Sequence, residues 1–371
     1  MKKFMTRPKI VVFDKFLGYQ VGGAGLSLEK LLENLFGDFK FIGCEVKKSF
    51  SAERLEKKDF PVERIKIKEI SRFPYLEYSL NRKKIAQFFS KQRGDCLFAQ
   101  SLWAPIAINN FQGKIIYFIR DENKLNRVPN YYSGLKAFLK KVYILTQYPF
   151  IKQFFLDNQK AIEKADLVIA NSYFIKDFIK EKFGRESEVI YPMIDVSGLQ
   201  KIKLLSFDQR PFLTLIGSEL IKGRPIVEKI ARRMKKHQFM IVGREFEKPV
   251  QKKNILYQPW SKQPLDIYRK TRILLIPSLW QEAFCRVAVE GMALGIPCLA
   301  SNRGGIPEVL DDEFLIKELW DIGEWASRIE KLETNYNNFP ERLKNKATKF
   351  DAKRQIKEFK RIVKTKFNFE L

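Results

Sequence analysis

The stretch from Ser278 to Leu310, SLWQEAFCRVAVEGMALGIPCLASNRGGIPEVL, contains the strongest fold signal in the chain. Just before it, Arg272–Ile276 (RILLI) is a short apolar run typical of a buried parallel strand. Within it, the pattern predicts a helix at Val287–Leu294 and a further strand at Pro297–Ala300. Strand, helix and strand in succession indicate a parallel α/β sheet.

Two glutamates in this stretch, Glu282 and Glu290, are separated by seven residues. Glu282 lies in the loop after a predicted strand, at the edge where open α/β sheets bind ligands. Glu290 falls in the first turns of the predicted helix. The backbone N–H groups of Phe284, Cys285 and Arg286 near the helix start are donors suited to a phosphate or a sugar hydroxyl. A carboxylate accepts two hydrogen bonds from a diol, so these groups together suit a nucleotide sugar.

The same alternation extends in both directions and divides the chain into two α/β halves. Each half begins with a strand, a glycine-containing loop and a helix, as in a doubly wound, Rossmann-like domain. No sequence repeat relates the halves. The predicted strands of the first half are Lys9–Phe13, Lys114–Ile119, Asp166–Ala170 and Glu188–Pro192; those of the second are Phe212–Ile216, Gln238–Val242, Asn254–Tyr257, Arg272–Ile276 and Pro297–Ala300.

The domain organisation follows from these halves. We expect an N-terminal, acceptor-side domain at 1–195, a linker at 196–209 where the periodicity is lost, and a C-terminal, nucleotide-sugar-binding domain at 210–350. A basic helix at 351–371 is expected to pack back on the N-terminal domain. We expect the two domains to face a central cleft, because ligands bind outside the strand carboxyl ends.

Composition excludes several classes of protein. The 371 residues are 45% hydrophobic and 30% charged, which is globular rather than disordered, and no apolar run approaches the length of a membrane span. The N-terminal apolar run is too short for a signal peptide, so a cytoplasmic protein is the expectation. None of the four cysteines forms a C-x-x-C pair, and His237, the one histidine, is predicted to be a solvated loop residue. A zinc site is therefore not expected.

The net charge of +26 indicates an anionic partner: nucleic acid, an anionic leaflet or a phosphorylated substrate. The alternative is a lysine-rich surface that is merely solvated. Asn81–Arg93 and Leu135–Phe155 mix lysines with large apolar residues, a pattern that fits either an ordinary domain helix or a helix lying on an anionic membrane.

The segment EAFCRVAVEGMALGIPCLASNRGGIPEVL (282–310) resembles the signature of the retaining glycosyltransferases of family four, which have the GT-B fold. Five further blocks resemble that family in the same order. They are ADLVIANSYFIKDFI (165–179), VIYPMID (189–195), IGSELIKG (216–223), FMIVGRE (239–245) and DIYRKTRILLIPSLW (266–280). The resemblance is strongest from Ala165 to Leu310 and weak from Phe36 to Gly113, where acceptor sites of this family vary.

The resemblance implies site roles for particular residues. Glu282 would bind the donor sugar hydroxyls, Glu290 would hold the ribose, and Lys222 would neutralise the leaving diphosphate without a metal. Asp121 is our third catalytic candidate. The remaining donor-binding candidates are Gly22, Gly23, Ala24, Ser218, Arg224, Gly243, Pro259, Trp260, Phe284, Cys285, Arg286 and Val287.

Three positions depart from the family pattern. Ser218 stands where many members have an arginine, and Cys285 stands where a glycine is usual, so its side chain is expected to narrow the sugar pocket. Many members carry a histidine after a central N-terminal strand; here the sequence reads YFIRDEN, which places Arg120, Asp121 or Glu122 at that point.

The resemblance implies transfer of a hexose-type sugar from a nucleoside-diphosphate sugar to a glycan or lipid-linked acceptor. It implies retention of configuration and a role in cell-surface polysaccharide or glycolipid synthesis. We expect no cofactor, no metal and no nucleic-acid partner, and contact with the inner face of the plasma membrane. The alternatives are a noncatalytic sugar-nucleotide-binding subunit, a hydrolase or epimerase on the same fold, and a basic nucleic-acid-binding protein.

Overall fold

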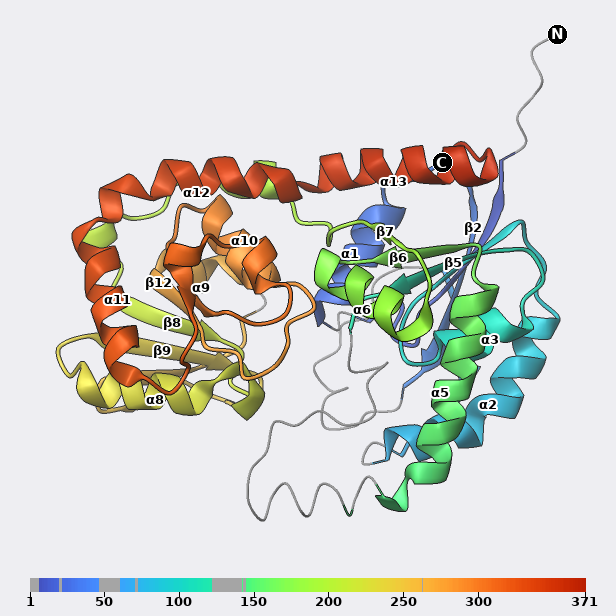
Figure 1. The fold of residues 1–371 in the computed structure, drawn as a ribbon, viewed down its shortest axis with the longest axis horizontal. Helices are drawn as coiled ribbons and strands as arrows, with labels where there is room; N and C mark the ends of the chain where they lie inside the picture. Colours follow the sequence, from blue (N-terminus) through green and yellow to red (C-terminus); the bar gives the residue numbers. More distant parts are fainter. Residues whose placement is uncertain are drawn as a thin grey trace, which may run out of the picture. The chain divides into compact units, whose positions relative to one another are not determined.

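A computed structural model describes residues 7–19, 22–46, 61–70, 73–121, 142, 145–261 and 263–371. The chain divides into two compact units: unit 1 is 1–193 with 355–371, and unit 2 is 194–354. Each unit is built on one sheet whose strand pairs are parallel or nearly all parallel (Figure 1), as the alternating pattern predicted. The range 196–209, where we placed the linker, lies in unit 2 and contains helix α7 (Val196–Gln200).

Unit 1 has a seven-stranded sheet in the order β3-β2-β1-β4-β5-β6-β7, and every strand pair is parallel. Helices α2, α3 and α5 pack against one another beside it (Figure 1). The strands are β1 (Lys9–Phe13), β2 (Asp38–Glu45), β3 (Val62–Lys66), β4 (Cys96–Ala99), β5 (Lys114–Ile119), β6 (Leu167–Ala170) and β7 (Glu188–Val189); the helices are α1 (Gly22–Leu32), α2 (Pro74–Ser90), α3 (Ala104–Asn110), α5 (Tyr148–Lys164), α6 (Tyr173–Phe183) and α13 (Ala352–Phe367).

From Gln355 onward, α13 belongs to unit 1. The Phe359 ring lies 5.8 Å from the ring centroids of both Phe98 and Phe118, and Gln355 accepts a hydrogen bond from the Tyr191 backbone N–H at 3.1 Å. Aromatic contacts of this kind add to the stabilisation gained from burying the rings.

Unit 2 has the order β10-β11-β9-β8-β12-β13-β14, in which only the β10–β11 pair is antiparallel. The central strands are largely buried, which is why they read as nearly continuous apolar runs. The strands are β8 (Phe212–Ile216), β9 (Gln238–Gly243), β10 (Val250–Lys252), β11 (Ile255–Pro259), β12 (Thr271–Ile276), β13 (Cys298–Ser301) and β14 (Leu315–Ile316). In addition to α7, the α-helices are α8 (Arg224–Arg233), α9 (Leu265–Arg269), α10 (Arg286–Ala293), α11 (Ile322–Thr334) and α12 (Pro340–Ala347).

The structure corrects two expectations about local structure, one at Gly22–Ala24 and one at His237. Gly22, Gly23 and Ala24 were expected in a loop, but α1 begins at Gly22, so they form its first turn. His237 is not a solvated loop residue: its Nε2 lies 3.0 Å from Glu333 Oε2, and its side chain is only 23% exposed. It precedes β9 and so lies at the strand amino ends, away from the ligand-binding edge.

Candidate active site

Two loops at the carboxyl edge of the unit 2 sheet are held together by their backbones. A 3-10 turn, η4 (Leu220–Lys222), follows β8, and the Leu279 N–H after β12 donates to the Ile221 carbonyl at 2.8 Å. Gly223 has φ +87°, and a Cβ there would lie 1.9 Å from the Pro277 carbonyl oxygen. Only glycine tolerates both conditions, so Gly223 sets the position of the preceding lysine.

Lys222 and Glu282 form an ion pair across these loops. Lys222 Nζ lies 2.6 Å from Glu282 Oε1, and the side chains are 34% and 11% exposed. Burial works to lower the pKa of Lys222, but the charge and hydrogen bond of Glu282 outweigh it, so the pKa stands above its ordinary value. Lys222 is therefore a cation at neutral pH, poised at the edge where ligands bind.

Ser278 supplies a second donor to the same carboxylate oxygen. Its hydroxyl donates to Glu282 Oε1 at 2.6 Å, and Ser278 is almost fully buried. Among the described residues no hydrogen bond reaches Glu282 Oε2. The carboxylate is thus oriented through one oxygen and retains the other as an acceptor. Sequence reasoning missed Ser278, although it immediately follows the Pro277 that ends the predicted strand.

The glycine pair after β13 supports the backbone of Glu282. Gly305 N–H donates to the Glu282 carbonyl at 2.6 Å. Gly304 has φ +59°, and a Cβ there would lie 2.3 Å from that same carbonyl oxygen. The Gly304–Gly305 turn therefore allows a backbone approach that any side chain would block.

Glu290, in α10, is held by two donors. The Tyr268 hydroxyl donates to Oε2 at 2.6 Å, and Arg286 donates to Oε1 at 3.2 Å. Burial raises the pKa of the Tyr268 phenol, and the adjacent Glu290 raises it further, so Tyr268 remains a donor. The described contacts leave lone pairs on both carboxylate oxygens, as binding of a diol requires.

The residues that begin α10 differ in exposure. Phe284 is buried, with its ring 5.6 Å from that of Phe350, and Cys285 is the N-cap residue. Burial raises the pKa of the Cys285 thiol to about 12, so the thiol is neutral. Cys285 is 4% exposed, and Arg286 and Val287 are half-buried.

Ser218 and its neighbours form a polar group after β8. Ser218 donates to Glu245 Oε2, and Gly243 makes room for it, because a Cβ there would lie 1.8 Å from Ser218 Oγ. Arg224 NH1 lies 3.6 Å from Glu245 Oε1, and its Nε donates to Glu228 at 2.9 Å. The structure thus pairs Arg224 with carboxylates. At position 218, where many members of the resembled family have an arginine, it places a buried serine hydroxyl.

Pro259 ends β11, and Trp260 follows it at the same sheet edge. The Trp260 N–H donates to the Gly243 carbonyl at 3.0 Å. Its side chain is 43% exposed, and the Arg244 guanidinium carbon lies 5.5 Å from its ring centroid. An exposed indole beside a guanidinium is a surface on which a planar base can stack.

The unit 1 candidates lie at the carboxyl edge of their own sheet. Arg120 and Asp121 directly follow β5, while Glu122 lies outside the described residues. Arg120 donates to Gln100 Oε1 at 2.8 Å and to Ser27 Oγ at 3.1 Å, and Gln100 Nε2 donates to the Ala24 carbonyl at 3.3 Å. The structure therefore brings the start of α1 and the end of β5 together through Gln100, which sequence reasoning did not identify.

Part of the chain matches a known protein family. A family model described as Glycosyl transferases group 1 matches residues 227–350. Glu282, Glu290 and the Gly304–Gly305 turn all lie in this matched region, whereas Lys222 and Ser218 lie just before it.

Two solved structures extend the likeness to the whole chain. HepE of Anabaena in complex with UDP and glucose has a TM-score of 0.68 at 17% identity, covering 97% of this chain and 100% of that one. Sucrose-phosphate synthase of Thermosynechococcus elongatus has a TM-score of 0.71 at 12% identity, covering 98% and 99%. At these identities the likeness shows the fold, which is GT-B, as the resemblance implied.

Among curated relatives, an uncharacterised 41.2 kDa protein in the cps region of Klebsiella pneumoniae is 26% identical over 57% of this chain. The match spans 59% of that relative's own length.

Proposed function

We propose that the protein is a glycosyltransferase that moves a sugar from a nucleoside-diphosphate sugar to a glycan or lipid-linked acceptor. The observation that carries the proposal is the Lys222–Glu282 pair, with Glu282 inside a group 1 domain and a second glutamate, Glu290, eight residues later. HepE was solved with UDP-glucose, which supports a nucleotide-sugar donor.

In the proposed reaction the bond between the sugar anomeric carbon and the diphosphate oxygen breaks, and the diphosphate leaves with the electron pair. The acceptor hydroxyl oxygen forms the new bond on the same face of the sugar, so that configuration is retained, and its proton passes to the departing diphosphate oxygen. Lys222 offsets the charge that develops on the diphosphate. Glu282 binds sugar hydroxyls through Oε2 and favours the positive charge that develops on the ring. In this proposal no metal takes part.

The remaining candidates complete the donor site in this proposal. Glu290 holds the ribose diol, and the α10 amides from Phe284 to Val287 contact the sugar and phosphate. Trp260 stacks on the base, next to Pro259 and Gly243. Gly22, Gly23 and Ala24 offer amides of the first turn of α1 to the diphosphate, and Arg120, Asp121 or Glu122 occupies the place of the family histidine.

The first experiment is a thermal-shift panel with UDP-, GDP-, ADP- and dTDP-sugars, since a ligand that binds only the native state raises the melting temperature. The donor that gives the largest shift is then tested for acceptor-dependent release of its nucleoside diphosphate. Binding followed by such release supports a transferase, and release without an acceptor indicates a hydrolase. No shift with any donor contradicts the proposal.

A second candidate is a noncatalytic sugar-nucleotide-binding subunit. It is favoured by Ser218, which stands where many members of the resembled family have an arginine. The Ser218 hydroxyl contacts Glu245 and offers no positive charge to the diphosphate. Under this alternative the donor binds and shifts the melting temperature, but no acceptor releases the nucleoside diphosphate.

The proposed setting is the cytoplasmic face of the plasma membrane, in synthesis of a surface polysaccharide or glycolipid. A relative encoded in a cps region supports this, as does the apolar and basic surface at the start of α5, where Tyr148 and Leu156 are 50% and 45% exposed and Lys152 is exposed. Residues 135–141, 143 and 144 of the amphipathic segment lie outside the described residues. No helix of the described part is long and apolar enough to cross a membrane. Failure to float with anionic liposomes at physiological salt would remove the membrane contact from the proposal.

A further inference from the structure

A second polar cluster lies at the carboxyl edge of the unit 1 sheet, where the chain leaves two adjacent strands. Lys15 follows β1, and Ser101 and Trp103 follow β4; β1 and β4 pair directly. The Lys15 backbone N–H donates to Ser101 Oγ at 3.4 Å. Since ligands of doubly wound sheets bind at this edge, the cluster lies where a ligand of unit 1 is expected.

Lys15 is a largely buried cation at this edge. It forms an ion pair with Glu77 of α2, and the two side chains are only 14% and 6% exposed. Lys15 Nζ lies 4.8 Å from the Trp103 ring centroid and 5.1 Å from that of Phe16. Removing a charged pair from water costs free energy. An ion pair that is kept at a ligand-binding edge therefore indicates a role in ligand binding rather than in stability.

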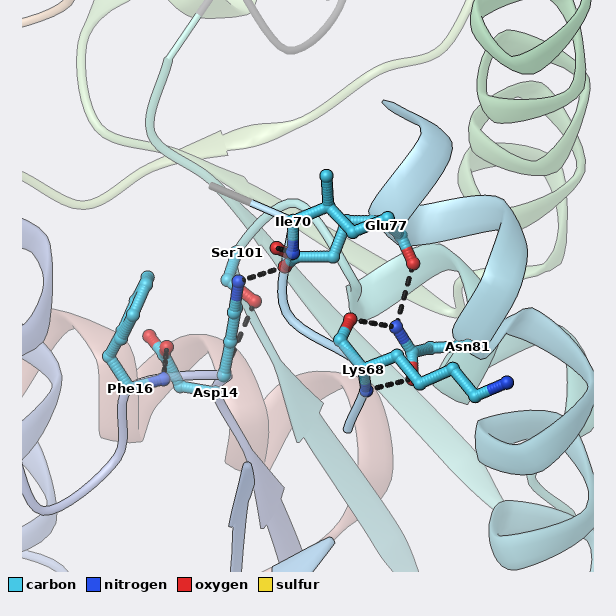
Figure 2. A network of polar contacts seen from close by, with 8 residues as sticks. Asp14, Phe16, Lys68, Ile70, Glu77, Asn81 and Ser101 are labelled. Carbon is cyan, nitrogen blue, oxygen red and sulfur yellow. Dashed lines mark hydrogen bonds and ion pairs between the residues drawn. The ribbon is translucent and has the colours of Figure 1, made fainter. Parts of the chain in front are cut away.

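Glu77 is a built-in counter-ion with both oxygens occupied (Figure 2). Oε1 pairs with Lys15, and Oε2 accepts from the Ile70 backbone N–H at 2.8 Å. Asn81, one turn later, exchanges hydrogen bonds with the Lys68 backbone, accepting at 2.8 Å and donating at 2.9 Å. The Glu77 carboxylate is thus firmly positioned, and both of its oxygens are already used.

Two neutral donors accompany Lys15. The Trp103 indole N–H is fully buried and has no hydrogen-bond partner among the described residues. A buried N–H without a hydrogen-bond partner costs free energy, and binding of a ligand or a water would remove that cost. Ser101 uses its oxygen as an acceptor from Lys15, and none of the described residues accepts its hydroxyl hydrogen. Ser101 also has φ +85°, a conformation that favours glycine, yet a serine stands there.

We propose that Lys15, Ser101 and Trp103 form a binding site for an anionic group, a phosphate or a carboxylate, with Glu77 as the internal counter-ion of Lys15. One ammonium and two neutral donors on these adjacent loops match the lone pairs of an oxyanion. Assigning this anion to the acceptor rests on the proposed function. The acceptor is then a phosphorylated lipid carrier or an acidic sugar chain, rather than a neutral glycan.

The test is calorimetric titration of the full chain with inorganic phosphate, farnesyl phosphate, glucuronate and, as a neutral probe, methyl glucoside. The expected result is saturable binding of at least one anion and none of methyl glucoside. Farnesyl phosphate binding more tightly than phosphate identifies a lipid-linked source, and preference for glucuronate identifies an acidic sugar. Absence of binding by all three anions overturns the proposal.

Variants locate the site. Trp103→Phe removes only the indole N–H, and Ser101→Gly removes the hydroxyl while relieving the positive φ. Each should weaken anion binding by about tenfold, the size of one hydrogen bond to a charged group, and Ser101→Gly should also raise the melting temperature. Lys15→Met should abolish binding. The matched control is Lys84→Met, an exposed lysine on α2, which should bind as the wild type does. Unchanged affinity in both Trp103→Phe and Ser101→Gly contradicts the assignment.

The two proposals fail separately. Nucleotide-sugar binding is measured on the same variants, and the inference predicts that it is unchanged in Trp103→Phe. Loss of anion binding with intact donor binding therefore tests the anion site alone. If the chain bound anions but no nucleotide sugar, the anion site would be supported, but its assignment to an acceptor would be contradicted.

Discussion

Each unit carries one lysine–glutamate pair at the carboxyl edge of its sheet, and the two pairs offer opposite chemistry. In unit 2, Lys222 and Ser278 both bind Glu282 Oε1, so an acceptor oxygen remains beside a cation. In unit 1, both Glu77 oxygens are occupied, and the spare groups are donors on Ser101 and Trp103. The first arrangement suits a sugar hydroxyl next to a diphosphate, and the second suits an anion alone.

The largest expected effect separates the two lysines. Lys222→Ala should reduce kcat by on the order of 10²–10³, because it removes a preorganised charge that opposes the leaving diphosphate. Lys15→Met should leave nucleotide-sugar affinity unchanged. Both are measured by acceptor-dependent nucleoside diphosphate release and by donor titration, with Lys236→Ala, exposed beyond α8, as control. Near-normal turnover of Lys222→Ala would contradict the assignment of Lys222 to the leaving diphosphate.

Ser278→Ala should have a smaller effect. Losing one hydrogen bond to a charged group costs about 1.5–3 kcal/mol, equivalent to roughly 10–150-fold in kcat/KM for the proposed transfer. Affinity for the nucleoside diphosphate without its sugar should not change, because Ser278 contacts only the carboxylate proposed to bind the sugar. Ser278→Thr retains the hydroxyl and should recover part of the activity. A parallel loss of nucleoside diphosphate affinity would show that Ser278 supports the whole loop instead.

A third prediction concerns pH. Glu282 holds the Lys222 pKa above its ordinary value against the opposing effect of burial. In wild type the Lys222 cation therefore persists until pH rises through that elevated pKa. In Glu282→Gln the two largest raising effects are lost while the lowering effect of burial remains, so nucleoside diphosphate binding should be lost at a lower pH than in wild type. Titrations across the alkaline range check this, and superimposable pH profiles would contradict it.

The smallest effects concern two glycines. Gly304→Ala should destabilise the chain by about 1–3 kcal/mol, because the new Cβ meets the Glu282 carbonyl at a positive φ. Gly25→Ala, inside α1 with nothing within 4 Å of its Cβ, should instead stabilise by about 0.5–1 kcal/mol. Denaturant melts measure both. If both substitutions were equally destabilising, the role of Gly304 beneath Glu282 would lose its support.

The fold could be predicted for most of the strands that are buried on both faces. The strand predicted at Arg272–Ile276 is β12 (Thr271–Ile276), and the helix predicted at Val287–Leu294 is α10 (Arg286–Ala293). Among the missed strands, β3 (VERIK) is an edge strand with three charged residues, which weakens its signal. The four-residue strand β4 (CLFA) was also missed, although it is fully buried.

The site was predictable where its residues lie close together in sequence. Glu282, Glu290 and the glycine turn fall within one stretch, and Lys222 entered through a family resemblance. Lys15 and Glu77 are 62 residues apart, about as far as Lys222 and Glu282 at 60, but no local pattern marks them. Their pairing, and the orphan N–H of Trp103, arise from tertiary packing that no spacing rule contains.

The central claim is that Glu282 recognises the sugar and Lys222 the diphosphate. The most direct test is calorimetric titration of wild type and Glu282→Gln, at neutral pH, with the best nucleotide sugar and with its nucleoside diphosphate alone. The account predicts that the variant still binds the nucleoside diphosphate but loses the additional affinity that the sugar confers. Equal affinity gains from the sugar in both proteins would contradict it.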